Sequence, residues 1–131
     1  MKWNEVNEST IRRTRGFVFG TEYDPLPHVH ALDLAAEGEI RGHIDAVRFC
    51  GDVIAGISLM SDSVLRLVHD KDPSLMCDYL LKRRSLYVMK GTARYEYTHA
   101  ILGPRESCFR DTPVPRQRRI SIILRCQPGP Q

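Results

Sequence analysis

The stretch Val53-Ile54-Ala55-Gly56-Ile57-Ser58-Leu59-Met60 decides the fold, because it is almost entirely apolar and has the length of one strand. A continuous apolar run of this length is typical of a strand that is buried on both sides. It is also the longest apolar run of the 131-residue chain, far short of the roughly 18–20 residues that span a bilayer. The run therefore predicts the centre of a β-rich core and no membrane contact.

Segments on both sides of this run alternate apolar and polar residues, the pattern of half-buried strands. They are residues 28–34, 40–49, 63–68, 75–81, 85–89 and 119–126. Residues 91–97 are compatible with a helical turn or a strand, and residues 103–115 form a polar, proline-containing loop. Seven or eight short strands with polar turns favour an all-β sandwich or barrel.

The ends of the chain are expected to lie outside this β core. Residues 3–15 contain good helix formers, and Gly16 is the expected C-terminal stop of a short helix. We therefore divide the chain into an N-terminal helix and loop over residues 1–27, a single β domain over residues 28–126, and a tail over residues 127–131.

Composition indicates an ordinary globular domain, with 42% hydrophobic and 27% charged residues and a net charge of +3. Such a mild charge does not predict the basic stripe of a dedicated nucleic-acid binder. The cysteines lie far apart without a Cys-x-x-Cys spacing, which argues against a zinc ribbon or a thioredoxin-type site. No secretory signal or other targeting segment is visible at the N-terminus, so we expect reduced thiols.

The motif Gly42-His43-Ile44-Asp45 lies in the strand expected over residues 40–49. Side chains two apart on a strand project to the same side, so His43 and Asp45 would meet at one point. They supply two of the three ligands of a two-histidine, one-carboxylate site for non-haem Fe(II).

A third ligand would come from another histidine. His28 and His30 precede the motif by too little chain to return to it easily, whereas spacing leaves both His69 and His99 open.

The last expected strand, Arg119-Ile120-Ser121-Ile122-Ile123-Leu124-Arg125, carries two arginines six residues apart. An even separation places Arg119 and Arg125 on one face of a strand, about 20 Å apart. Because guanidinium groups match carboxylates, the two arginines could hold opposite ends of a small diacid. Tyr87, on another strand, could donate its hydroxyl to a carboxylate.

In the order His-x-Asp, Tyr, His and Arg-x-x-x-x-x-Arg, these residues resemble the AlkB-like Fe(II)/2-oxoglutarate-dependent dioxygenases. The resemblance extends from about residue 28 to residue 126, and stretches such as Phe49-Cys50-Gly51 and Leu67-Val68-His69 are similar to the mitochondrial branch of the family. It implies an all-β double-stranded β-helix, or jelly-roll, as the dioxygenase domain over residues 28–126. It also implies a location in the mitochondrial matrix.

The same resemblance implies a role for each candidate residue. His43, Asp45 and His99 would be the catalytic iron ligands, which favours His99 over His69. Tyr87 and Arg119 would bind the distal carboxylate of 2-oxoglutarate, and Arg125 would support the keto-acid group or the metal site. Fe(II) would be the cofactor, with 2-oxoglutarate and O2 as co-substrates.

Two departures from the family bear on the substrate. Leu32 and Leu34 stand where nucleic-acid-repairing members have an asparagine and a tyrosine that bind the co-substrate. Only 27 residues precede the first expected strand, so a base-flipping lid and a duplex DNA clamp are not expected.

We therefore expect hydroxylation of a protein or another undefined substrate. The alternative is a mitochondrial RNA (tRNA) N-demethylase that would use the basic loop residues Arg105, Arg110, Arg116 and Arg118, although these are more typical of a solvated loop face. A remote alternative is a non-catalytic jelly-roll binding module, against which the complete triad argues. The sequence leaves the substrate and the oligomeric state open.

Overall fold

The structure, a computed structural model, describes residues 3–129. It contains a long helix α1 (Glu5–Phe19) and a short helix α2 (Thr92–Tyr95). The strands are β1 (His30–Leu34), β2 (Ile40–His43), β3 (Val53–Leu59), β4 (Ser63–His69), β5 (Met76–Leu81), β6 (Ser85–Lys90), β7 (Tyr97–Ile101), β8 (Cys108–Phe109), β9 (Thr112–Pro113) and β10 (Arg119–Arg125).

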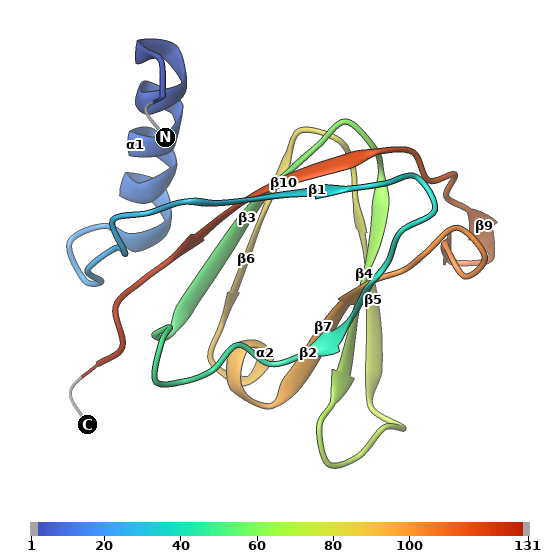
Figure 1. Cartoon of the computed structure of the whole chain (residues 1–131). Coiled ribbons are helices and arrows are strands. Elements are labelled where there is room, and N and C mark those ends of the chain that lie inside the picture. Colours follow the sequence, from blue (N-terminus) through green and yellow to red (C-terminus); the bar gives the residue numbers. More distant parts are fainter. Residues whose placement is uncertain (1–2, 130–131) are drawn as a thin grey trace.

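Eight of the strands form two four-stranded sheets that face each other (Figure 1). One sheet has the order β1-β10-β3-β6 and the other has the order β2-β7-β4-β5, and all neighbouring strands are antiparallel. The short strands β8 and β9 pair with each other as a separate hairpin. This arrangement confirms the predicted double-stranded β-helix, and β3 lies inside its sheet as the apolar run predicted.

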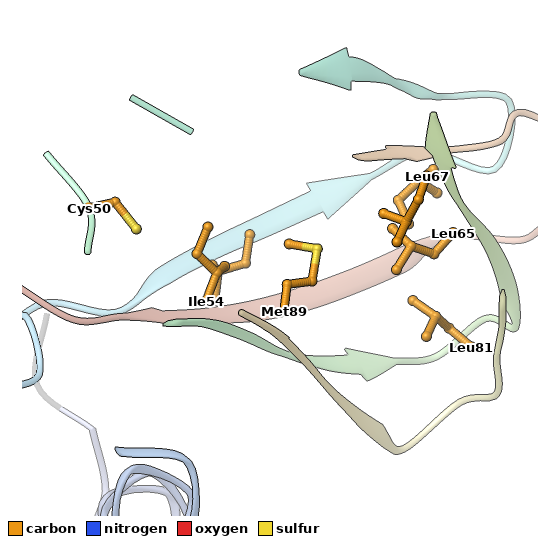
Figure 2. Packing of buried hydrophobic residues seen from close by; sticks show 8 residues of the cluster. Cys50, Ile54, Leu65, Leu67, Leu81 and Met89 are labelled. Atoms are coloured by element: carbon orange, nitrogen blue, oxygen red, sulfur yellow. The ribbon is translucent and has the colours of Figure 1, made fainter. Parts of the chain in front are cut away.

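The core fills the space between the two sheets. Figure 2 shows Ile54 and Met89 of the first sheet facing Leu65, Leu67 and Leu81 of the second. Apolar residues on alternate positions of each strand point inward, so burying them from both sheets is the main favourable contribution to folding.

Helix α1 packs on the outer face of the first sheet, where Ile11 and Phe19 join a buried cluster with β3 and β10. Asn4 caps the N-terminus of the helix, because its side chain accepts a hydrogen bond from the backbone N–H of Asn7 at 2.8 Å. The predicted stop at Gly16 is wrong. The helix continues to Phe19 and ends at Gly20, whose φ of 55° suits glycine. Burial of Phe19 against the sheet explains the extra turn.

Several predicted boundaries also differ. Strand β2 ends at His43, so the expected strand over residues 40–49 is wrong beyond that point, and Asp45 lies in the following loop. The ambiguous segment over residues 91–97 contains α2 and the start of β7. The predicted loop over residues 103–115 contains the β8–β9 hairpin. Residues 130–131 of the expected tail lie outside the described residues.

Two further findings concern the whole described region. The cysteines are free: Cys50 and Cys126 are buried, while Cys77 and Cys108 are exposed. Across residues 3–129, helices with the length and apolarity needed to cross a bilayer are absent.

Candidate active site

The two histidines of the site come from neighbouring strands of the second sheet. His43 on β2 lies directly opposite His99 on β7 in the antiparallel register. Directly opposite side chains lie close together on one face of a sheet, and the two imidazole centroids are 4.3 Å apart. The structure thus brings His99 to the motif.

Asp45 reaches the same point from the loop after β2. Its Oδ1 lies 3.4 Å from Nε2 of His43 and 3.7 Å from Nε2 of His99. Its Oδ2 accepts a hydrogen bond of 2.6 Å from Nε of Arg125. Burial acts to raise the pKa of Asp45, but the hydrogen bond and charge of Arg125 outweigh burial and lower it. Asp45 is therefore an anion.

His43, Asp45 and His99 each offer one ligand atom, and these atoms lie within 4.8 Å of one another. Nδ1 of His43 lies 2.9 Å from the carbonyl oxygen of Arg41. Because a carbonyl only accepts, Nδ1 of His43 donates to it, and Nε2 is the ring nitrogen that faces Asp45. The three groups form an arrangement that one metal ion could contact.

His99 is held in the neutral form that ligates metals. Burial, together with the nearby charge of His43, lowers the pKa of His99 to about 4. Its imidazole is therefore unprotonated at neutral pH.

A second group of polar residues lies on the first sheet. Arg119 is only 2% exposed, and its Nε donates a 2.9 Å hydrogen bond to Oγ of Ser58. Its Nη2 is buried and has no hydrogen-bond partner within residues 3–129. Burial lowers the pKa of Arg119, although a guanidinium remains charged at neutral pH. A buried cation with a free donor is suited to an anionic ligand.

Tyr87 lies beside this arginine on β6, where it faces Gly56 of β3. A Cβ atom on Gly56 would lie 2.4 Å from atoms of the Tyr87 ring, so only glycine leaves room for the ring. Burial raises the pKa of Tyr87, and its hydroxyl therefore stays protonated and able to donate.

These residues line one small cavity of about 130 Å³ between the sheets. His43, His99, Tyr87, Arg119 and Arg125 all contribute to its wall. Ser121 and Ile123 also line it, as expected for residues that share a face of β10 with the two arginines.

A wider hollow of about 460 Å³ also borders the candidate metal ligands His43 and Asp45, which with His99 we call the ligand group. His43 and Arg125 line both spaces, so the ligand group lies at their boundary. The wall of the wider hollow is mainly apolar, with contributions from Leu26, Ile44, Ala46, Phe49 and Ile123. A larger hollow of about 750 Å³ between α1 and β1 contains none of the candidate site residues.

The other histidines have different positions. His69 accepts hydrogen bonds through Nδ1 from the backbone N–H groups of Lys71 and Asp72, and thus holds a turn; it is not part of the group formed by His43, Asp45 and His99. His28 lines the wider hollow and the larger hollow, but not the small cavity. His30 lines the small cavity as well, because β1 pairs with β10, but it is not part of the group formed by His43, Asp45 and His99.

The expected solvated face of the basic loop is partly wrong. Arg116 is buried, and its guanidinium donates to the carbonyl oxygens of Leu102, Gly38 and Ala35. Arg118 is paired with Asp33 at 2.6 Å. Arg105 and Arg110 are exposed.

One residue beside the site escaped the sequence analysis. Arg94 on α2 is 1% exposed and donates to the carbonyl oxygen of Asp45 at 2.9 Å. In the sequence, Arg94 is one charged residue in a short segment, and nothing near it indicates burial. The carbonyl groups that it contacts lie more than forty residues earlier in the chain.

Comparison with known proteins supports the resemblance found in the motifs. The proteins named alpha-ketoglutarate-dependent dioxygenase alkB homolog 7, mitochondrial, of Bos taurus and Mus musculus are each 44% identical to the chain, over 97% and 96% of its residues. The chain spans 58% and 57% of the length of these relatives. No family model matches the chain.

Among solved structures, that of OsALKBH1 is similar with a TM-score of 0.60, over 95% of this chain and 66% of that chain. At 15% sequence identity this likeness concerns the fold alone. The chain is therefore a relative of the AlkB-like dioxygenases, as its sequence motifs predicted.

Proposed function

We propose that the chain is an Fe(II)- and 2-oxoglutarate-dependent dioxygenase domain of the AlkB-like, mitochondrial type. One observation carries the proposal: the buried Arg119 guanidinium, with its free Nη2, lines the same small cavity as His43 and His99. The proposal assigns the dioxygenase domain to residues 28–126 and the location to the mitochondrial matrix. The names of the mammalian relatives support a mitochondrial location.

The residues fit the two groups that this reaction requires. Two imidazoles and a carboxylate, all presenting ligand atoms within 4.8 Å of one another, are the donor set that suits Fe(II) with open positions. Arg119 and Tyr87 offer donors to the far carboxylate of a five-carbon diacid. His43, Asp45 and His99 would therefore hold the metal, while Arg119 and Tyr87 would hold 2-oxoglutarate.

Bound iron, with 2-oxoglutarate and O2, supplies oxidative decarboxylation to succinate and CO2 coupled to hydroxylation of a C–H bond. The chain's own residues bind and orient. Arg125 holds Oδ2 of Asp45, and the main-chain carbonyl of Arg41 accepts a hydrogen bond from Nδ1 of His43 and thus orients its ring. The apolar walls Ile54, Leu65 and Ile101 exclude water from the small cavity.

The substrate would approach through the wider hollow, which is the second space bordering the ligand group. We assign it a protein or another substrate that undergoes hydroxylation. If the oxidised carbon is an N-methyl group, its hydroxylated product releases formaldehyde and the net result is demethylation. Of the basic loop residues that the alternative, RNA demethylation, would use, Arg116 is buried and Arg118 is paired with Asp33, whereas Arg105 and Arg110 are exposed.

Thermal unfolding with Mn(II) and N-oxalylglycine, an analogue of 2-oxoglutarate, tests the site. We expect the pair to raise Tm by about 5–10 °C in the wild type. The double variant His43→Ala/Asp45→Ala should lose this shift. His69→Ala is the matched control, because its imidazole lies outside the ligand group, and it should retain the shift.

No shift in the wild type, or an undiminished shift in the double variant, would remove the dioxygenase proposal. Succinate release then separates the substrates: a protein extract should stimulate it, and stimulation by methylated mitochondrial tRNA alone would favour the RNA alternative.

A further inference from the structure

Arg94 is a buried arginine whose hydrogen bonds run to the backbone. Its Nε donates to the carbonyl oxygen of Gly51, its Nη2 to that of Cys50 and its Nη1 to that of Asp45, each at 2.9 Å. The side chain is 1% exposed and forms no ion pair with a carboxylate of residues 3–129. All three nitrogens of the guanidinium group are therefore used to fix one segment of main chain.

The segment is the loop over residues 45–51, which begins with the candidate ligand Asp45. Arg94 contacts the first residue of this loop and its last two residues, so a single side chain holds both ends of the loop in place. Within the loop, the N–H groups of Phe49 and Cys50 donate to the carbonyl oxygen of Ala46. The same loop supplies Ala46, Phe49 and Cys50 to the wall of the wider hollow.

Arg94 also stands close to the other half of the ligand group. It belongs to α2, and β7 begins two residues after that helix ends, with His99 as its third residue. Its hydrogen bonds thus join the element that leads into His99 to the loop that carries Asp45. Asp45 is held at two points: Arg125 fixes the carboxylate, and Arg94 fixes the main chain beneath it.

We propose that Arg94 is a positioning residue for the metal site, which sets the position of Asp45 relative to His99 without touching metal or substrate. The proposal rests on the proposed function, because it assumes that Asp45 and His99 are ligands. An arginine is needed at this point because only a guanidinium offers planar donors in three directions. A lysine ammonium at the end of a flexible stem would not reproduce this pattern.

Arg116 provides a matched control. It is also buried, at 8% exposure, and its guanidinium also donates to three backbone carbonyls. These carbonyls belong to Ala35, Gly38 and Leu102, which do not line the small cavity. Replacing either arginine with methionine removes three comparable hydrogen bonds, but only one of the two sets contacts the ligand loop.

The experiment compares the full chain with Arg94→Met and Arg116→Met. Tm should fall by a similar amount in both variants. Mn(II) affinity, measured by electron paramagnetic resonance, should weaken about 10- to 100-fold in Arg94→Met and by less than about twofold in Arg116→Met. The visible absorption spectrum of the Co(II)-loaded protein should change only in Arg94→Met, because it reports ligand geometry rather than stability.

Arg94→Lys is the second variant, for the case in which the methionine variant does not fold. It keeps the charge and part of the hydrogen bonding, and it should bind Mn(II) with an intermediate loss. Wild-type Mn(II) affinity in the folded Arg94 variant, or an equal loss in Arg116→Met, would overturn the positioning role while leaving the dioxygenase proposal intact. Failure of the wild type to bind Mn(II) would overturn both.

Discussion

The two arginines of β10 differ in what they contact, although they share one face of the same strand. Arg119 is 2% exposed, makes one side-chain hydrogen bond to Ser58, and has a free buried nitrogen within residues 3–129. Arg125 is half-buried, and its Nε is already occupied by Asp45 at 2.6 Å. One arginine is thus ready to receive a ligand, whereas the other completes a group that is already present.

Under the proposed function, this difference would separate co-substrate binding from metal binding along a single strand. A buried cation without a full set of partners destabilises the ligand-free protein, and it gains those partners when an anion binds. A cation already paired with a buried carboxylate orients that carboxylate instead. The following substitutions test whether the two functions separate as the contacts suggest.

The largest effect is expected from Arg119→Met. Loss of the charge-assisted hydrogen bonds should weaken 2-oxoglutarate binding by about 100-fold, or about 3 kcal/mol, while Mn(II) affinity changes little. Because the free buried nitrogen is removed, Tm of the ligand-free protein should stay the same or rise. Calorimetry with each ligand and thermal unfolding check both statements. Equal losses of Mn(II) affinity and 2-oxoglutarate affinity would mean that Arg119 and Arg125 do not have separate roles in binding.

Gly56→Ala should disturb co-substrate binding near Arg119, because it displaces Tyr87. The added Cβ would lie 2.4 Å from the Tyr87 ring, which must therefore move. Forcing an extra methyl group into a packed core costs about 2 kcal/mol in free energy of unfolding. Denaturant unfolding measures this cost, and the KM for 2-oxoglutarate should rise as well. An unchanged KM would show that Tyr87 does not contribute to co-substrate binding.

Arg125→Met should weaken metal binding rather than co-substrate binding, and by a smaller factor. Asp45 would lose the hydrogen bond to its Oδ2, so Mn(II) affinity should weaken about tenfold, or about 1.4 kcal/mol. At saturating Mn(II), binding of N-oxalylglycine should change by less than about threefold. A titration in which the analogue is lost and the metal is retained would reverse the roles that we assign to the two arginines.

The smallest effect is expected from Ser58→Ala, which removes the side-chain hydrogen bond to Arg119. One hydrogen bond contributes about 1 kcal/mol, so 2-oxoglutarate affinity should fall about fivefold. Ser121→Ala on the neighbouring strand is the control, because Ser121 lines the small cavity and makes no side-chain hydrogen bond to Arg119 within residues 3–129. If both variants behave alike, Ser58 does not orient the guanidinium.

The sequence predicted those features that depend on local periodicity. Alternation correctly placed Arg119, Ser121, Ile123 and Arg125 on one face, since every residue of β10 lies in regular strand. His43 and Asp45 do meet as predicted, but not through strand alternation, because β2 ends at His43. Arg94 instead holds the main-chain carbonyl of Asp45, and Arg125 holds its carboxylate. Such long-range bonds leave no periodic signal in the sequence.

Tertiary packing explains the other differences. His30 was set aside because of its short chain distance to the motif, yet pairing of β1 with β10 brings it to the small cavity. Arg116 resembled a solvated loop residue, but its carbonyl partners lie in other parts of the chain. Helix α1 continues beyond Gly16 because Phe19 is buried against the sheet. Each outcome depends on a partner distant in sequence.

The division of the site between the two sheets has a consequence for the lifetime of the protein. His43 and His99 belong to one sheet, whereas Arg119 and Tyr87 belong to the other. Metal and co-substrate together would act as a cross-link through the middle of the sandwich, worth about 2.7 kcal/mol at a hundredfold excess over Kd. Resistance to proteolysis would then follow the supply of 2-oxoglutarate, so that abundance of the protein tracks the metabolic state of its compartment.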